Sequence, residues 1–70
     1  MAILKTGDWV MTKMKKIGWV NFEEGEQYVH LAFPDSHWRS YRRDSLVLLD
    51  ESMQKLLNAT YEEFVRVNTI

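Results

Sequence analysis

The spacing of apolar residues changes near residue 50, and this change divides the chain into two unlike parts. Before it, short segments alternate between apolar and polar residues, which is the period of a strand with one buried face. After it, apolar residues recur every three or four positions, as on one face of a helix. No Pro-, Gly- or Ser-rich linker separates the parts. We therefore expect one domain over residues 1–70, with strands in residues 7–49 and one amphipathic helix over residues 50–67.

Turn-forming residues divide the first part into five candidate strands, at residues 9–15, 17–23, 27–33, 38–43 and 46–49. Gly25 lies in the charged loop after the second strand, and Pro34 opens the turn before the fourth. Asp44 and Ser45 interrupt the last two strands, which suits a single helical turn. Short strands joined by tight turns favour a small, strongly bent antiparallel barrel, because closure leaves few free edges. Alternation predicts an interior made of Val10, Val20, Phe22, Val29, Leu31, Phe33, Tyr41, Leu46 and Leu48.

The predicted helix has a clear start and one apolar stripe. Asp50 can cap its N-terminus, and Glu51 is favourable in the first turn. A lone helix of this length is marginal in water, so the stripe must be buried against the strands. The stripe consists of Met53, Leu56, Leu57, Tyr61, Phe64 and Val65.

Four short motifs occur along residues 7–49: Gly7–Val10, Lys16–Val20, Val29–Asp35 with Trp38 and Tyr41 after it, and Leu46–Leu49. In order and spacing they resemble the strands of SH3-like barrels of the Tudor, KOW and CarD-type groups. The resemblance implies a mainly β fold, a small five-stranded antiparallel barrel, that binds nucleic acid, a modified protein tail, or a transcription or translation partner. The long Gly-rich loop of KOW motifs is absent from the second strand, and the C-terminal helix lies outside the resemblance.

Alternation places several large aromatic side chains on the outer faces of the strands, although aromatics make up only 13 % of the chain. These residues can form an apolar seat for the helix. Alternatively, two or three of them stay exposed as a binding platform, and both arrangements can hold together. The outer aromatic residues are Trp9, Trp19, Tyr28, His30 and Trp38.

Residues 37–43 interleave three arginines with two aromatic residues, a pattern that suits stacking on bases and pairing with phosphates. Alternatively, the arginines are ordinary strand-surface charges paired with Glu23, Glu24 or Asp44. Lysines 13, 15 and 16 form a second basic group that can extend the patch. The predicted ligand-binding residues are Trp9, Trp19, Tyr28, Trp38, Arg39, Arg42, Arg43 and Lys13.

Several classes of function are disfavoured by what the sequence lacks. There is no Cys, and the two histidines show no metal-ligand spacing. No nucleophile elbow and no Gly-rich phosphate loop occur, so we expect neither enzymatic activity, nor a cofactor, nor a metal. No apolar run is long enough to cross a bilayer, and no signal peptide is recognisable. We therefore expect no membrane partner and a cytoplasmic location.

The charge balance leaves two kinds of partner open. The formal net charge is −1, with a basic excess in residues 1–22 and an acidic excess in residues 50–70. Near-neutrality disfavours strong non-specific binding to duplex DNA. The sequence predicts a non-enzymatic binding module, associated with nucleic acid or transcription through the Arg/aromatic strand. The alternative is a protein-interaction module or a homodimer that uses an aromatic groove or the helix.

Overall fold

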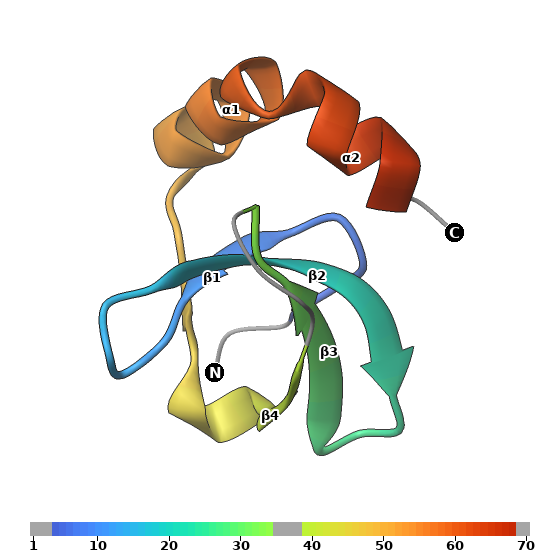
Figure 1. Cartoon of the computed structure of the whole chain (residues 1–70). Helices are drawn as coiled ribbons and strands as arrows, with labels where there is room; N and C mark the ends of the chain where they lie inside the picture. The colour runs from blue at the N-terminus through green and yellow to red at the C-terminus, as the bar shows by residue number, and fades with distance from the viewer. Residues whose placement is uncertain (1–3, 35–38, 69–70) are drawn as a thin grey trace.

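The computed structural model describes residues 4–34 and 39–68, which form one five-stranded antiparallel sheet and two helices (Figure 1). The fold is mainly β, as expected, and the strand order is β4-β3-β2-β1-β5. Among the described residues β4 and β5 are the two edges, and no pairing between them closes the sheet. The strands are β1 (Trp9–Met11), β2 (Ile17–Glu24), β3 (Tyr28–Ala32), β4 (Arg39–Arg42) and β5 (Val47–Leu48).

A 3-10 turn, η1 (Arg43–Ser45), joins β4 to β5 and confirms the single helical turn expected at this point. The expected turn over residues 34–37 and the start of the fourth strand at Trp38 lie, apart from Pro34, outside the described residues. The sheet bends around one core on its inner face. That core contains Leu4, Val10, Val20, Val29, Leu31, Phe33 and Leu46, with Tyr41 packed against it.

Two residues predicted inside the barrel are exposed instead, so the prediction for Phe22 and Leu48 is wrong. The register between β2 and β3 shifts between Val20 and Phe22, which inserts Asn21 as an extra residue. A bulge of this kind moves the following side chain to the other face of the sheet. Leu48 faces the same side as its register partner Val10, but β5 is a short edge strand, and among the described residues no further strand pairs beyond it to cover this side chain.

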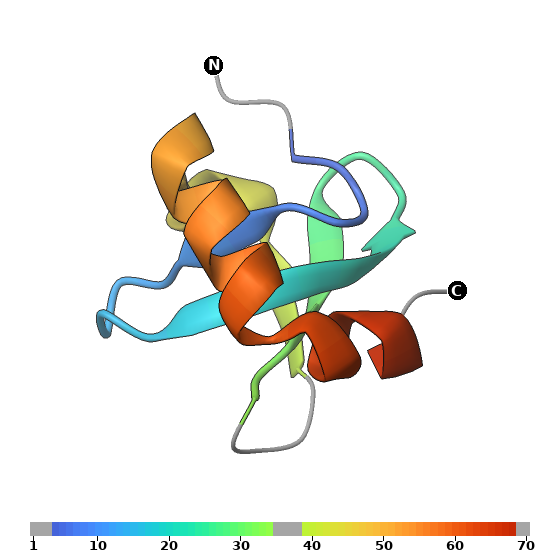
Figure 2. The same ribbon diagram turned by 90° about the horizontal axis from the view of Figure 1, so that it is seen from above.

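The C-terminal segment forms two helices where one was expected, α1 (Glu51–Thr60) and α2 (Glu62–Asn68). The backbone of Tyr61 leaves the helical region, with φ −113° and ψ 39°. A straight helix over residues 50–67 would be about 27 Å long, close to the longest dimension of the molecule, 28 Å. The break turns α2 away from the direction of α1 and back over the bent sheet (Figure 2). The expected cap is confirmed, because the Met53 N–H donates to Asp50 Oδ1 at 2.8 Å.

The two helices cover a second apolar cluster on the outer face of the sheet. Trp9 and Trp19, 0 % and 2 % exposed, are register partners on β1 and β2. The indole N–H of Trp9 donates to Asn58 Oδ1, and that of Trp19 donates to the Gly7 carbonyl oxygen. The interpretation of outer aromatics as the helix seat is confirmed for these two residues. The helix side chains that pack on them include Met53, Leu57, Phe64 and Val65.

One polar side chain ties α1 to the strand beneath it. The Gln54 amide accepts from the Trp9 N–H at 2.8 Å and donates to the Trp9 carbonyl oxygen at 2.7 Å. It also donates to the carbonyl oxygen of Leu49, at 3.1 Å. These are the bonds that a neighbouring strand makes, so Gln54 takes the place of a strand where β5 ends. Neither described helix has the length and apolar character that a bilayer crossing needs.

Candidate binding surface

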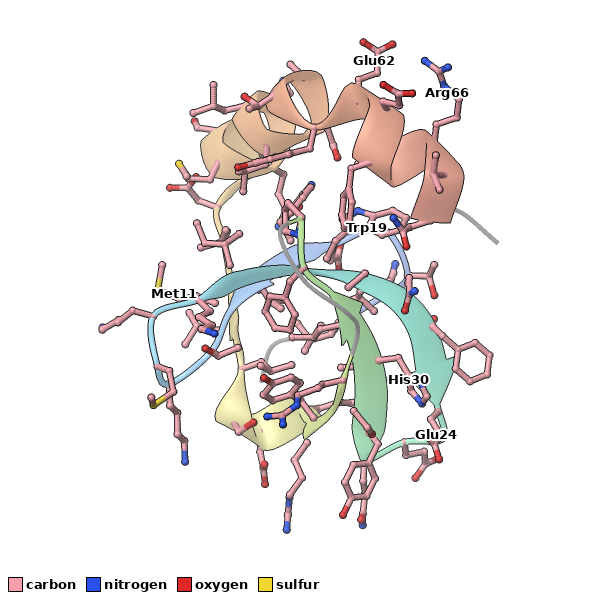
Figure 3. The ribbon with its side chains drawn as sticks, viewed as in Figure 1. Met11, Trp19, Glu24, His30, Glu62 and Arg66 are labelled. Atoms are coloured by element: carbon pink, nitrogen blue, oxygen red, sulfur yellow. The ribbon has the colours of Figure 1, made fainter. Side chains whose placement is uncertain are left out.

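The helices cover the part of the outer face around Trp9 and Trp19, and another part of that face lies at the β2–β3 hairpin. Cross-strand register places its side chains in two rows that run across β2, β3 and β4. Figure 3 shows His30 and Glu24 at this end of the sheet, away from Trp19 and the helices. We call this surface the hairpin face. Its rows are Phe22–His30–Ser40 and Glu24–Tyr28–Arg42.

Two aromatic rings of the hairpin face are open to solvent. Phe22 is 47 % exposed and Tyr28 is 42 % exposed. The rings of Phe22 and His30 meet edge to face, with centroids 5.3 Å apart and planes at 86°. His30 Nε2 also contacts the Glu24 carboxylate, and the two side chains point toward one another in Figure 3. These contacts hold the imidazole and support the Phe22 ring, so the ring is partly fixed before any ligand arrives.

Arg42 supplies a cation at the edge of the hairpin face. Its Nη2 lies 3.0 Å from Asp44 Oδ2, and both side chains are largely exposed. An exposed pair of this kind contributes little to stability, so the guanidinium can exchange this partner for a ligand anion. Tyr28 is the direct register partner of Arg42 on β3. Cross-strand partners share a face of the sheet, which places this ring beside the cation.

The structure distributes the other two arginines differently. Arg39 is the register partner of Leu31, a core residue, so its side chain projects from the inner face of the sheet and does not belong to the hairpin face. Arg43 donates from Nη1 to the Leu4 carbonyl oxygen at 2.6 Å and from Nη2 to Glu23 Oε1 at 3.1 Å. The hydrogen bond from Arg43 lowers the pKa of the Glu23 carboxyl below its ordinary value, with a smaller lowering from the Thr6 backbone.

Arg43 therefore ties the N-terminal segment to the hairpin. The interpretation of the arginines as paired surface charges is confirmed for Arg43 with Glu23 and for Arg42 with Asp44. The three arginines do not lie in one strip, because strand alternation and the Arg43 hydrogen bonds separate them.

The remaining predicted site residues also separate. Trp9 and Trp19, predicted as ligand-binding residues, are buried under the helices and offer no surface to a ligand. Lys13 is exposed in the turn between β1 and β2. Five residues of β2, roughly 16 Å of strand, separate the start of β2 from Phe22, so the lysines and Arg42 do not form one patch. Trp38 lies outside the described residues.

Phe22 is the surface residue that alternation missed. The one signal in the sequence is Asn21, a poor strand former between Val20 and Phe22. Within the described segments, no group of three or more His, Asp or Glu residues is placed to hold a metal ion. No protein-family model, curated protein or solved structure matches the chain. The surface must therefore be interpreted from its own geometry.

Proposed function

We propose that the protein is a small non-enzymatic binding module of the SH3-like barrel type that holds single-stranded nucleic acid on the hairpin face. The observation that carries this proposal is the pair of exposed rings, Phe22 and Tyr28, in adjacent rows of a sheet beside the Arg42 guanidinium. Rows on one face of a sheet are about 6.6 Å apart, which leaves room for one base over each ring. Exposed rings on strands are a sequence-tolerant platform, because every base has a face that can stack.

The charge of the protein favours a single strand over a duplex. The net charge is −1, and Lys13, Lys15 and Lys16 lie in the turn at the other end of β2 from the hairpin face, so little counterion release is available to drive duplex binding. Stacking contributes about 1–3 kcal/mol per base, and it needs unpaired bases whose faces are free. Arg42 would pair with the phosphate that links two stacked bases.

The SH3-like part of the proposal is supported by the topology. The five strands follow one another as a meander, except that β5 returns to pair with β1. The η1 turn makes that return after β4. The bulge in β2 helps the sheet to bend around the inner core. This arrangement is compatible with a small barrel.

Fluorescence anisotropy with labelled single-stranded DNA and RNA, and with the matching duplex, tests the proposal at low salt. We expect Tyr28→Ala and Phe22→Ala each to weaken single-strand binding about tenfold. Arg42→Met should reduce the salt slope by about 0.7. Met14→Ala is the matched control, because Met14 is strongly exposed in the distant β1–β2 turn.

The proposal fails if no single strand binds at low salt. It also fails if the duplex binds as well as the single strand, or if Met14→Ala weakens binding as much as Tyr28→Ala. Far-ultraviolet circular dichroism of each variant shows that the sheet is intact, so that a loss of binding is assigned to the surface.

A further inference from the structure

A cavity of about 290 Å³ opens between the helices and the end of the sheet that lies away from the hairpin face. Its walls are mostly apolar. The two lining side chains with polar groups are Lys16, just before β2, and Tyr61, at the break between α1 and α2. Drug-sized ligands need cavities of about 300–1,000 Å³, so this one suits a single large side chain. The lining residues are Lys16, Ile17, Phe33, Pro34, Leu57 and Tyr61.

An apolar row leads from the edge of the sheet to this cavity. Val47 pairs with Met11, and Met11 pairs with Ile17, so the three side chains share the outer face. Ile17 belongs both to the row and to the cavity wall. Val47 is 65 % exposed, and Leu56 of α1, next to Leu57 in the chain, is 58 % exposed. We call the row and the cavity together the apolar strip.

The apolar strip has the dimensions of a short peptide contact. The row crosses two strand spacings, about 10 Å, which is the reach of about three extended residues. Figure 3 shows Met11 at the opposite end of the sheet from His30 and Glu24, so the strip and the hairpin face are separate parts of its outer face. The row itself, Val47, Met11 and Ile17, carries no ring on which a base can stack, and the exposed ring of the strip is Tyr61 at the cavity.

A basic turn borders the mouth of the cavity. Lys13, Lys15 and Lys16 lie in the loop between β1 and β2, and all three are exposed. No carboxylate in the described part of the chain forms an ion pair with any of them. The three positive charges beside the apolar strip are therefore available to an acidic partner.

The buried Thr12 holds this turn in one conformation. The Thr12 N–H donates to the Lys16 carbonyl oxygen, and the Lys15 N–H donates to the Thr12 carbonyl oxygen. The Lys16 N–H also donates to Thr12 Oγ1, at 3.2 Å. Lys15 adopts a left-handed backbone, with φ 66°, which is uncommon for a residue with a side chain, and the hydrogen bonds of the turn hold it there. The basic groups are thus presented from an ordered loop, which reduces the entropy lost on binding.

We propose that the apolar strip docks an acidic peptide segment of another protein. One large apolar side chain of the peptide enters the cavity, and flanking carboxylates face Lys13, Lys15 and Lys16. The charge complementarity selects a peptide that is negative around its apolar anchor. This interaction is independent of nucleic-acid binding, because the two surfaces share no residue.

The test uses the full chain and three labelled synthetic peptides. The first has one Leu flanked by Asp and Glu, the second has Ala in place of Leu, and the third has Lys in place of every acidic residue. We expect the Leu-to-Ala change to weaken binding about tenfold or more, because it empties the cavity. The basic peptide should not bind. Amide chemical-shift changes caused by the first peptide should fall in residues 11–17 and 56–61 and not in residues 22–30.

Charge reversal on the protein provides the matched comparison. Lys16→Glu should weaken binding of the acidic peptide severalfold at low salt, and the difference should shrink at high salt. Lys55→Glu is the control, because Lys55 is exposed on α1 and lines no part of the cavity.

Several results would overturn this proposal. Equal binding of the basic peptide would do so, as would equal losses for Lys16→Glu and Lys55→Glu, or shift changes confined to the hairpin face. If single-stranded DNA changes the amide chemical shifts of residues 11–17 and displaces the peptide, the lysines bind nucleic acid and not an acidic peptide. A concentration-dependent dimer in light scattering that Lys16→Glu abolishes would make a second copy of the chain the occupant.

Discussion

Replacing Gln54 by Met tests the inference that one side-chain amide couples α1 to the sheet. Met has similar volume and similar helix propensity, so the helix and its packing stay as they are. The replacement removes the hydrogen bonds to both backbone groups of Trp9 and to the Leu49 carbonyl oxygen. The Trp9 carbonyl oxygen still accepts from the Leu49 N–H at 3.2 Å, whereas the described residues offer the Trp9 N–H no acceptor besides Gln54.

The expected cost follows from this inventory. An intramolecular hydrogen bond contributes about 1 kcal/mol net, and a stranded donor in a buried setting costs about 1–3 kcal/mol. Gln54→Met should therefore lower the free energy of unfolding by about 2–3 kcal/mol. The total free energy of unfolding of a chain of this length is roughly 3.5–10 kcal/mol, so the variant should lose a large share of its stability. Its midpoint of thermal unfolding should fall by about 10–20 °C.

Urea unfolding followed by tryptophan fluorescence measures the loss directly, because Trp9 lies beneath Gln54. Lys55→Met is the control in the next helix position. Lys55 is exposed, and its ion pair within the described residues is with the exposed Glu51, so its replacement should leave the midpoint unchanged. A loss below about 0.5 kcal/mol for Gln54→Met, or equal losses for the two variants, would refute the role of Gln54 as a strand substitute.

Three further predictions concern the core, an ion pair and the helix cap. Gly18→Ala places a Cβ 3.0 Å from a ring carbon of Phe33 and should cost about 1–3 kcal/mol by overpacking; an unchanged urea midpoint would contradict it. Because Arg43 lowers the pKa of Glu23 in the folded state, the wild type should lose stability as pH falls below the ordinary pKa of 4.5. Arg43→Met should show a smaller loss over the same acidic range, and equal pH profiles for the two proteins would exclude this linkage. Asp50→Ala should lower the free energy of unfolding by about 1 kcal/mol in a thermal melt, and no shift in the midpoint would show that the cap is dispensable.

The strands and the helix start were predictable because they depend on local patterns. Alternation identified all five strands, and Asp50 marked the start of α1 correctly. The ends of the strands were less predictable, since β1 stops at Met11 where pairing with β2 gives way to a turn. The break at Tyr61 was not predictable from periodicity, because the apolar stripe of the predicted helix continues past Tyr61 at the same spacing.

The candidate site was predicted only in part. Tyr28 and Arg42 lie on the exposed surface as expected, whereas Trp9 and Trp19 are core residues. The outer face of each strand was assigned correctly for both tryptophans, but alternation does not say which part of a face a helix will cover.

The sequence by itself determined the element types, their order and the cap of α1, because period, turn residues and capping act over a few neighbouring positions. Only the tertiary structure decided which aromatic rings face solvent. That choice depends on the bulge at Asn21, which turns the Phe22 side chain to the outer face of the sheet. It also depends on the break at Tyr61, which directs α2 over Trp19. The bulge belongs to the pairing of β2 with β3, and the break brings Phe64 onto the Trp19 ring. Both depend on contacts between elements, where burial of large side chains outweighs the local pattern.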